Sequence, residues 1–237
     1  DADDTAGAVL ALKHLGPIDD ATREAALAGI EWLLGVQNKD GGIPTFCRGW
    51  GALPFDRSSA DITAHAVRAW LAWFDEAPPR MQQRMVTAWN RAFRFLCRTQ
   101  RADGSWVPLW FGNQGEPEEE NPTYGTSRVL RALSGAISFF AQGELRSPLI
   151  RQMCFLLEAQ TRATQWLLRT QKPDGGWGGG TGRNASVEET ALAVEALASL
   201  LASETPMVGP MEPVVAAVAV GANWLIERVE SGAFTQP

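Results

Sequence analysis

The sequence predicts an all-α fold, an α/α toroid that forms an incomplete α6-α6 barrel from about four helix-pair repeats. Three observations support this prediction. A motif with an aromatic residue, Leu, Gln and an Asp-Gly turn recurs along the chain, a second series of segments centred on threonine alternates with it, and the helical segments between them have two different hydrophobic patterns. Helix pairs that bury each other's faces produce such curved arrays.

The first motif marks the end of a helix in each repeat. The copies are "WLLGVQNKDGGI" from Trp32, "FLCRTQRADGSW" from Phe95, "WLLRTQKPDGGW" from Trp166 and a shortened "WLIERVESGAF" from Trp224. Each is typical of the last turns of an amphipathic helix, a glycine stop, and a turn whose final aromatic residue folds back onto the helix end.

The second series marks the start of the other helix in each repeat. The segments "DDTAGAV", "DITAHAV", "YGTSRVL" and "EETALAV" align on Thr5, Thr63, Thr126 and Thr190, with a spacing of about 60 residues. The helices that follow are apolar around most of their circumference, so we expect inner helices buried on both sides. Segments that end in Gln are apolar on one side only, so we expect outer helices that face water.

Composition limits the possible function classes. The chain has 237 residues and a net charge of -6, with a pI near 5.1, which argues against a nucleic-acid partner. The three cysteines, Cys47, Cys97 and Cys154, are far apart and odd in number, so they indicate neither a disulfide framework nor a metal site. No apolar stretch reaches the roughly 20 residues of a spanning helix. We expect a cytoplasmic protein.

The long connections read as loops over one barrel end rather than as domain boundaries. Residues 41–60 and 107–122 contain Gly, Pro and Trp, as do functional loops on a helical scaffold. We therefore expect one domain, residues 1–237. Because the sequence begins in the middle of a helix cap without Met, we also expect that it is a piece of a longer polypeptide.

Three carboxylates, Asp1, Asp3 and Asp4, precede the first apolar helix, although one Asp would be enough for capping. In the threonine alignment His65 lies two residues after its threonine and Tyr124 two residues before its own, so these side chains are expected at one end of the barrel. Crowded carboxylates retain a proton, and a nearby imidazolium stabilises the conjugate base. Any one of these residues alone would be read as a cap or core residue, but together they indicate acid catalysis.

The residues resemble a known family. "DADDTA" resembles the Asp-x-Asp-Asp-Thr-Ala signature of class II terpene cyclases, and the repeats resemble the QW motifs of squalene-hopene and oxidosqualene cyclases. The resemblance covers the chain and corresponds to the latter half of a squalene-hopene cyclase. It implies that Asp3 protonates a terminal double bond with support from Asp1 and Asp4, that His65 hydrogen-bonds the acid, and that Tyr124 belongs to the proton-return network.

The resemblance also implies an aromatic lining for the carbocation. Trp110, four residues after Trp106, would form one wall, and Trp50 and Phe55 would contribute. Cation–π stabilisation by a desolvated ring amounts to about 2 kcal/mol. No metal, nucleotide or redox cofactor is expected.

The sequence departs from the family pattern at several places. The loop at 41–60 is shorter, an acidic insertion separates Trp110 from Tyr124, and the last repeat lacks its Gln and its final Trp. The preceding half, with the N-terminal barrel, is also missing. We expect the isolated fragment to be inactive, its partners to be an isoprenoid substrate and that N-terminal barrel, and the parent protein to attach peripherally to the inner membrane face.

Several functions remain open. The leading one is the proton-initiated polycyclisation of a linear, squalene-like triterpene. A class II diterpene cyclase acting on a prenyl diphosphate would share the Asp motif and use Mg²⁺. A protein prenyltransferase β-like barrel would need an Asp-x-Cys zinc pair, and a complement-type toroid its Gly-Cys-Gly-Glu-Gln thioester; neither occurs. A catalytically incomplete terpenoid-binding toroid is the non-enzymatic alternative.

Overall fold

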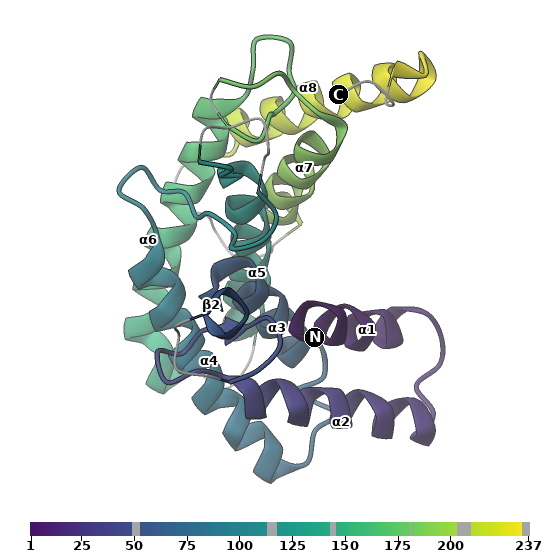
Figure 1. Cartoon of the computed structure of the whole chain (residues 1–237), viewed down its shortest axis with the longest axis vertical. Helices are drawn as coiled ribbons and strands as arrows, with labels where there is room; N and C mark the ends of the chain where they lie inside the picture. Colours follow the sequence, from purple (N-terminus) through teal and green to yellow (C-terminus); the bar gives the residue numbers. More distant parts are fainter. Residues whose placement is uncertain (49–52, 113–117, 143–145, 181, 203–209, 234–237) are drawn as a thin grey trace. The chain divides into compact units, whose positions relative to one another are not determined.

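The computed structural model describes residues 1–48, 53–112, 118–142, 146–180, 182–202 and 210–233 (Figure 1). In these ranges the chain forms helices and one short antiparallel strand pair. In chain order the elements are α1 (Ala2–His14), α2 (Asp20–Val36), β1 (Ile43–Pro44), a 3-10 turn (Pro54–Asp56), β2 (Ser58–Ser59), α3 (Ala60–Ala72), α4 (Pro79–Thr99), α5 (Pro122–Gln142), α6 (Arg146–Thr170), α7 (Val187–Leu201) and α8 (Glu212–Glu230). The predicted class, an all-α toroid-type fold of inner and outer helices, is confirmed.

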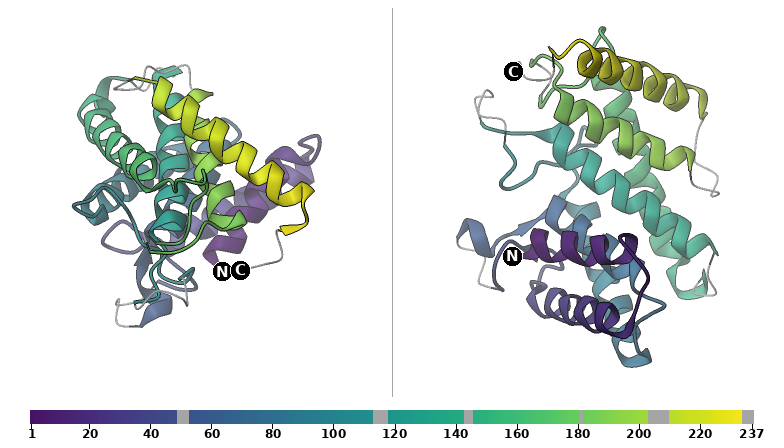
Figure 2. Two further views of the ribbon diagram at one scale, coloured as in Figure 1. Left: turned by 90° about the horizontal axis from the view of Figure 1, so that it is seen from above. Right: turned by 90° about the vertical axis from the view of Figure 1, so that its right-hand side faces the viewer.

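The chain divides into two compact units, Asp1–Thr99 and Gln100–Pro237. In the first unit α1 packs on α3, α2 on α1, and α4 on α3. The right-hand view of Figure 2 shows α1 and α2 side by side. In the second unit α5 packs on α7, with α6 against α5 and α8 against α7, so that α7 lies between α5 and α8. Each unit therefore contains two inner helices with an outer helix behind each.

Burial distinguishes α3 and α5 from α1 and α7. The inner helices α3 and α5 are buried over most of their length, whereas α1 buries only Ala2, Ala6 and Val9 and α7 leaves Ala191 and Glu195 exposed. The prediction that the inner helices are buried on both sides is therefore wrong for α1 and α7. These are the first and last inner helices along the chain, and each packs on one inner helix of its unit.

The glutamine of a QW motif joins its own turn to the outer helix that follows. Its side-chain amide donates both to a carbonyl of its own turn and to a carbonyl of the following outer helix, at 2.9–3.0 Å. The sets are Gln37 with Gly41 and Ala88, Gln100 with Gly104 and Ala159, and Gln171 with Gly175 and Ala217. A buried amide whose two hydrogens are both bonded holds the turn and its neighbour in one geometry.

The glycine of the Asp-Gly step adopts a backbone conformation with positive φ. Gly41, Gly104 and Gly175 have φ of 97°, 98° and 100°, a region that L-residues with a side chain rarely adopt. A Cβ on Gly41 would lie 2.3 Å from the carbonyl oxygen of Arg91. Glycine is therefore required both for the turn and for the close approach of the next outer helix.

The two aromatic positions of the motif have different partners. The final Trp177 folds back as predicted, since its Nε1 donates to the carbonyl of Leu167 at 2.9 Å. The leading Trp166 and Trp224 instead donate to the aspartates of the preceding turns. These pairs are Trp166 with Asp103 and Trp224 with Asp174, both at 3.1 Å. The shortened last copy therefore retains the indole that completes the turn before it.

The threonine series is connected to the QW series by hydrogen bonds. In three of the four repeats the threonine hydroxyl accepts from the backbone N–H at the end of the preceding QW turn. The pairs are Ile43 to Thr63 at 2.8 Å, Trp106 to Thr126 at 3.0 Å, and Trp177 to Thr190 at 2.9 Å. This bond fixes where α3, α5 and α7 begin, so these threonines occupy equivalent positions in their repeats.

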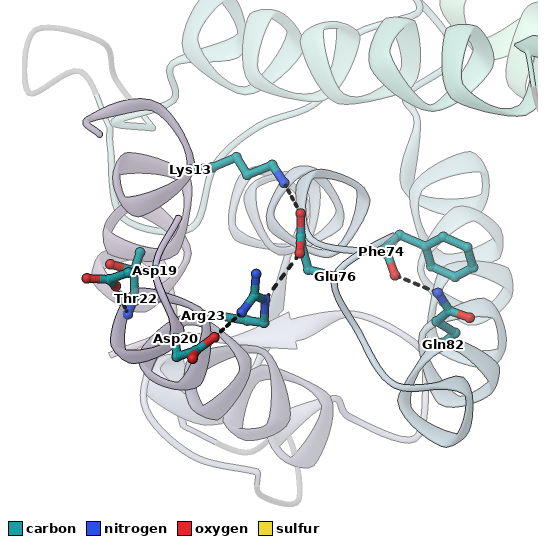
Figure 3. Close-up of polar contacts among 8 residues, drawn as sticks. All are labelled: Lys13, Asp19, Asp20, Thr22, Arg23, Phe74, Glu76 and Gln82. Atoms are coloured by element: carbon teal, nitrogen blue, oxygen red, sulfur yellow. Dashed lines mark hydrogen bonds and ion pairs between the residues drawn. The ribbon is translucent and has the colours of Figure 1, made fainter. Parts of the chain in front are cut away.

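A cluster of charged side chains lies at the C-terminal end of α1, away from Asp3 (Figure 3). Glu76 accepts from Lys13 at 3.4 Å and from Arg23 at 3.3 Å, and Arg23 also contacts Asp20 at 2.7 Å. The hydrogen bond from Arg23 lowers the pKa of Glu76. The cluster ties the last turn of α1 and the first turn of α2 to the loop after α3.

Candidate functional site

The first unit brings Asp3 and His65 into contact. Asp3 lies in the first turn of α1 and His65 in the second turn of α3, and Nδ1 of His65 is 2.6 Å from Oδ1 of Asp3. Their side chains are 27% and 11% exposed. A separation this short is typical of a charge-assisted hydrogen bond. The threonine register therefore predicted a contact between residues of different repeats.

Further contacts hold α1 in place for this pair. The N–H of Ala2 donates to the carbonyl of Thr45 at 2.7 Å, and the indole of Trp73 donates to the carbonyl of Val9 at 2.8 Å. A Cβ on Gly7 would meet Cε1 of His65 at 3.6 Å. The imidazole thus lies against a glycine surface of α1, one turn beyond the acid it contacts.

The other two N-terminal aspartates have different surroundings. Asp1 is the N-cap of α1, and its Oδ1 accepts from the N–H of Asp4 at 2.8 Å. Asp4 is exposed to solvent. Capping therefore accounts for Asp1, which leaves Asp3 as the aspartate of the three that contacts His65.

Asp61 is a candidate functional residue that the sequence analysis missed. It opens α3, is 3% exposed, and accepts a very short hydrogen bond from the hydroxyl of Ser59. Burial raises the pKa of Asp61, and the charge of Asp3 raises it further. The signal was present in the alignment, because Asp61 precedes its threonine by the same two residues as Asp3 does.

Asp61→Asn is expected to change the pH dependence of stability. Because the folded-state pKa is raised above 3.8, the folded protein binds more protons than the unfolded chain in the window just above that value, and stability falls as pH rises through it. Asparagine cannot ionise, so the variant should gain stability relative to wild type between acidic and neutral pH. Melting temperatures of both proteins at several pH values test this. Parallel curves would contradict it.

Tyr124 belongs to the second unit, at the start of α5. It is 6% exposed, and its N–H donates to Oδ1 of Asn121 at 3.0 Å. The ring stacks on Phe111 with centroids 4.7 Å apart, and the guanidinium carbon of Arg128 lies 5.5 Å from the Tyr124 centroid. Tyr124 is thus a buried ring that has Phe111 and Arg128 among its neighbours.

Asn121 also connects to a second buried acid, Glu189 of α7. Its amide donates to Oε1 of Glu189 at 2.9 Å. Burial raises the pKa of Glu189, and this hydrogen bond opposes the effect. The start of α5 is therefore fastened to the start of α7 within the second unit.

The predicted aromatic lining is only partly described. Trp110 and Phe55 are 46% and 39% exposed, so both present ring surface outside the core of their own units. Trp50 lies outside the described residues.

Over the described residues, no group of His, Cys, Asp or Glu side chains has the arrangement to hold a metal ion. The described helices also include none that is both long and apolar enough to cross a membrane.

Comparisons with known proteins identify the family of this chain. The family model of the squalene-hopene cyclase C-terminal domain matches residues 1–233. Enfumafungin synthase of Hormonema carpetanum is 30% identical over 96% of this chain and 17% of its own length. Drimenyl diphosphate synthase of Streptomyces showdoensis is 31% identical over 96% of this chain and 34% of its own.

A bacterial squalene-hopene cyclase and a solved structure complete the comparison. Squalene-hopene cyclase of Alicyclobacillus acidocaldarius is 31% identical over 75% of this chain and 34% of its own. A family 10 polysaccharide lyase from Cellvibrio cellulosa is similar with a TM-score of 0.58 at 15% identity, over 94% of this chain and 71% of that one, which shows the fold alone. The chain spans about a third or less of each of these curated relatives. From its motifs, its Asp3–His65 pair and the matching family model, this chain belongs to the squalene-hopene cyclase C-terminal domain family.

Proposed function

We propose that this chain supplies the general acid of a proton-initiated terpene cyclase, and that Asp3 is that acid. The observation that carries the proposal is the 2.6 Å contact between Asp3 and His65 at the start of two inner helices. In the reaction, protonated Asp3 transfers its proton to one carbon of a terminal double bond. The π electrons form the new C–H bond, and the other carbon becomes a tertiary carbocation.

His65 would stabilise the carboxylate that remains. As an imidazolium it donates from Nδ1 to Oδ1 of Asp3, so the conjugate base is hydrogen-bonded at the moment when it forms. The N-terminus of α1 behind Asp3 favours the same charge. Asp1 would support the acid by capping that helix, and Asp4 would do so from the exposed side of the same turn.

Asp61 would help to keep a proton in the site. Two carboxyl groups that influence each other resist carrying two negative charges, and Asp61 is buried next to the charge of Asp3. Tyr124 would take part in the final proton return. Trp110, Phe55 and Trp50 would stabilise carbocations with their π faces.

The substrate would be an acyclic terpene, and two classes have support. A squalene-like triterpene follows from the QW motifs and from the squalene-hopene cyclase relatives. A prenyl diphosphate, accompanied by Mg²⁺, is favoured by relatives named drimenyl diphosphate synthase and copalyl diphosphate synthase. In either case we propose that residues 1–237 form one domain and that the intact protein has a companion barrel besides it. When the substrate is a hydrocarbon, we propose that the intact protein attaches peripherally to a membrane.

Cyclisation in D₂O tests the proposal. The intact gene product is incubated with squalene and, separately, with geranylgeranyl diphosphate, and products are identified by mass spectrometry. We expect a cyclic product that carries one deuterium from solvent on a carbon of the former terminal double bond. A cyclic product without solvent deuterium, or one formed with release of diphosphate, would contradict the proposal. Binding without any product would favour a terpenoid-binding toroid.

A further inference from the structure

The first two QW turns each receive a hydrogen bond from an arginine of the following outer helix. Arg91 of α4 donates to the carbonyl of Asn38 at 2.6 Å, and Arg162 of α6 donates to the carbonyl of Arg101 at 2.6 Å. Both arginines also lie against the positive-φ glycine of the turn. The residue of α8 that approaches the glycine of the third turn in the same way is Val220. The third turn therefore lacks the guanidinium that occupies this place in the other two.

The second turn also carries a cation that the chain itself neutralises. Arg101 follows the QW glutamine and donates with two nitrogens to the carboxylate of Glu120, in the loop before α5. Lys172 follows the glutamine of the third turn in the same way. Counted back from the threonine of the next inner helix, Asn184 occupies the position of Glu120. In the third repeat a neutral amide thus stands where the second has a carboxylate.

Lys172 and Asn184 line one pocket of about 580 Å³ in the second unit. Arg183, in the loop before α7, and Arg228, in the last turn of α8, line the same pocket. The guanidinium carbon of Arg228 lies 4.8 Å from the ring centroid of Trp224, a contact that restrains this cation. Three cationic side chains therefore meet at one pocket, in a chain whose net charge is -6.

Among the described residues that line the pocket, Asp174 is the acidic one, and its carboxylate already serves the turn. Oδ1 of Asp174 accepts from the N–H of Gly176 at 3.2 Å, and Oδ2 accepts from the indole of Trp224 at 3.1 Å. Three cations and this one carboxylate leave the lining with a net charge of +2.

The chemistry of the lining fits a group that presents several anionic oxygens. A guanidinium donates in parallel to two oxygens of a phosphate, a lysine ammonium acts as a compact point charge, and an asparagine amide donates two further hydrogens. A carboxylate offers only two oxygens to these donors, whereas a phosphate offers three or more. A phosphate therefore uses more of the lining than a carboxylate does.

We propose that this pocket binds a phosphate group, which takes the place of the carboxylate that Glu120 supplies in the preceding repeat. The proposal goes beyond the cyclisation reaction and does not involve Asp3, because every lining residue belongs to the second unit. Two sources carry such a group, a small phosphorylated solute and the head group of an anionic phospholipid.

Two binding measurements on the full chain test the proposal and separate these sources. The chain is titrated with inorganic diphosphate in metal-free buffer by calorimetry. It is also sedimented with phosphatidylcholine vesicles, with and without phosphatidic acid. Binding of diphosphate alone supports a solute site, and binding that requires phosphatidic acid supports a lipid site. Failure to bind either probe would overturn the proposal.

Variants at an exposed position of the pocket assign the binding. Asn184→Glu introduces a carboxylate that should pair with Lys172, as Glu120 pairs with Arg101, and so compete with the ligand. We expect the probe that binds wild type to bind this variant about tenfold or more weakly, since a hydrogen bond to a charged group contributes that much. Asn184→Gln is the matched control, because it keeps a neutral amide and should bind like wild type. Both substitutions are at an exposed side chain, and melting temperatures verify their folds.

Arg228→Gln should weaken binding of the same probe, whereas Arg94→Gln, an exposed arginine of α4, should not. On the wild-type chain the bound probe should shield Arg183, but not Arg94, from modification by phenylglyoxal, as read by peptide mass spectrometry. This measurement does not depend on how the variants fold. Equal affinity of Asn184→Glu and Asn184→Gln, or equal modification of Arg183 with and without the probe, would overturn the assignment to this pocket.

Discussion

Asp3→Asn is expected to reduce cyclisation by the intact gene product about 10³-fold, within the range attributed to general acid catalysis. An amide cannot donate the proton that starts the reaction. It can still accept the hydrogen bond from His65, because its carbonyl oxygen can take the place of Oδ1. The fold and the binding of substrate should therefore be retained. Turnover, substrate affinity and melting temperature of the variant are measured together.

The matched control for this experiment is Glu24→Gln. Glu24 is an exposed carboxylate on α2, so the same charge is removed without touching the Asp3–His65 pair. Turnover close to wild type is expected for Glu24→Gln. If Asp3→Asn kept wild-type turnover, Asp3 would not be the acid. If it lost turnover together with its fold, a structural role of the Asp3–His65 contact would explain the loss instead.

Gly41→Ala is expected to destabilise the chain by about 3 kcal/mol. Two effects combine at this position. The backbone φ of 97° is unfavourable for any residue with a Cβ, and that Cβ would lie 2.3 Å from the carbonyl oxygen of Arg91. Relief would require α4 to move away, which would stretch the bond from Gln37 to Ala88. The free energy of unfolding in urea measures the effect.

Gly35→Ala provides the opposite control. Gly35 lies inside α2, and nothing lies within 4 Å of where its Cβ would be. Alanine is favoured over glycine in a helix by up to about 1 kcal/mol, so this variant should be slightly more stable than wild type. A similar loss from both substitutions would mean that the turn geometry at Gly41 is not the cause.

The features that repeat along the chain could be predicted from the sequence. The threonine alignment predicted that His65 would meet the N-terminal aspartates, because equivalent starts of neighbouring inner helices lie at one end. The Gln and Asp-Gly positions predicted the turns. Repetition made these predictions possible, since a single copy of either motif would have had several interpretations.

Features that depend on one local geometry were not predictable. Three aspartates within four residues have the same chemistry, and only the backbone at the start of α1 decides that Asp1 caps while Asp3 contacts His65. Asp61 was missed because an aspartate at a helix start is ordinarily a capping residue. Its near-complete burial depends on how Ser59 and the preceding loop fold over it. The placement of Tyr124 with the acid stays a prediction.

The glutamine bonds have a consequence for the order of assembly during translation. Each QW turn is completed by a carbonyl that lies 46 to 59 residues later in the chain. At ribosomal rates of about 5–20 residues per second, a turn waits several seconds for that partner. During this interval its indoles and its amide are uncovered on the nascent chain. The interval is longest at Gln100, whose partner Ala159 lies 59 residues later, and shortest at Gln171, whose partner Ala217 lies 46 residues later.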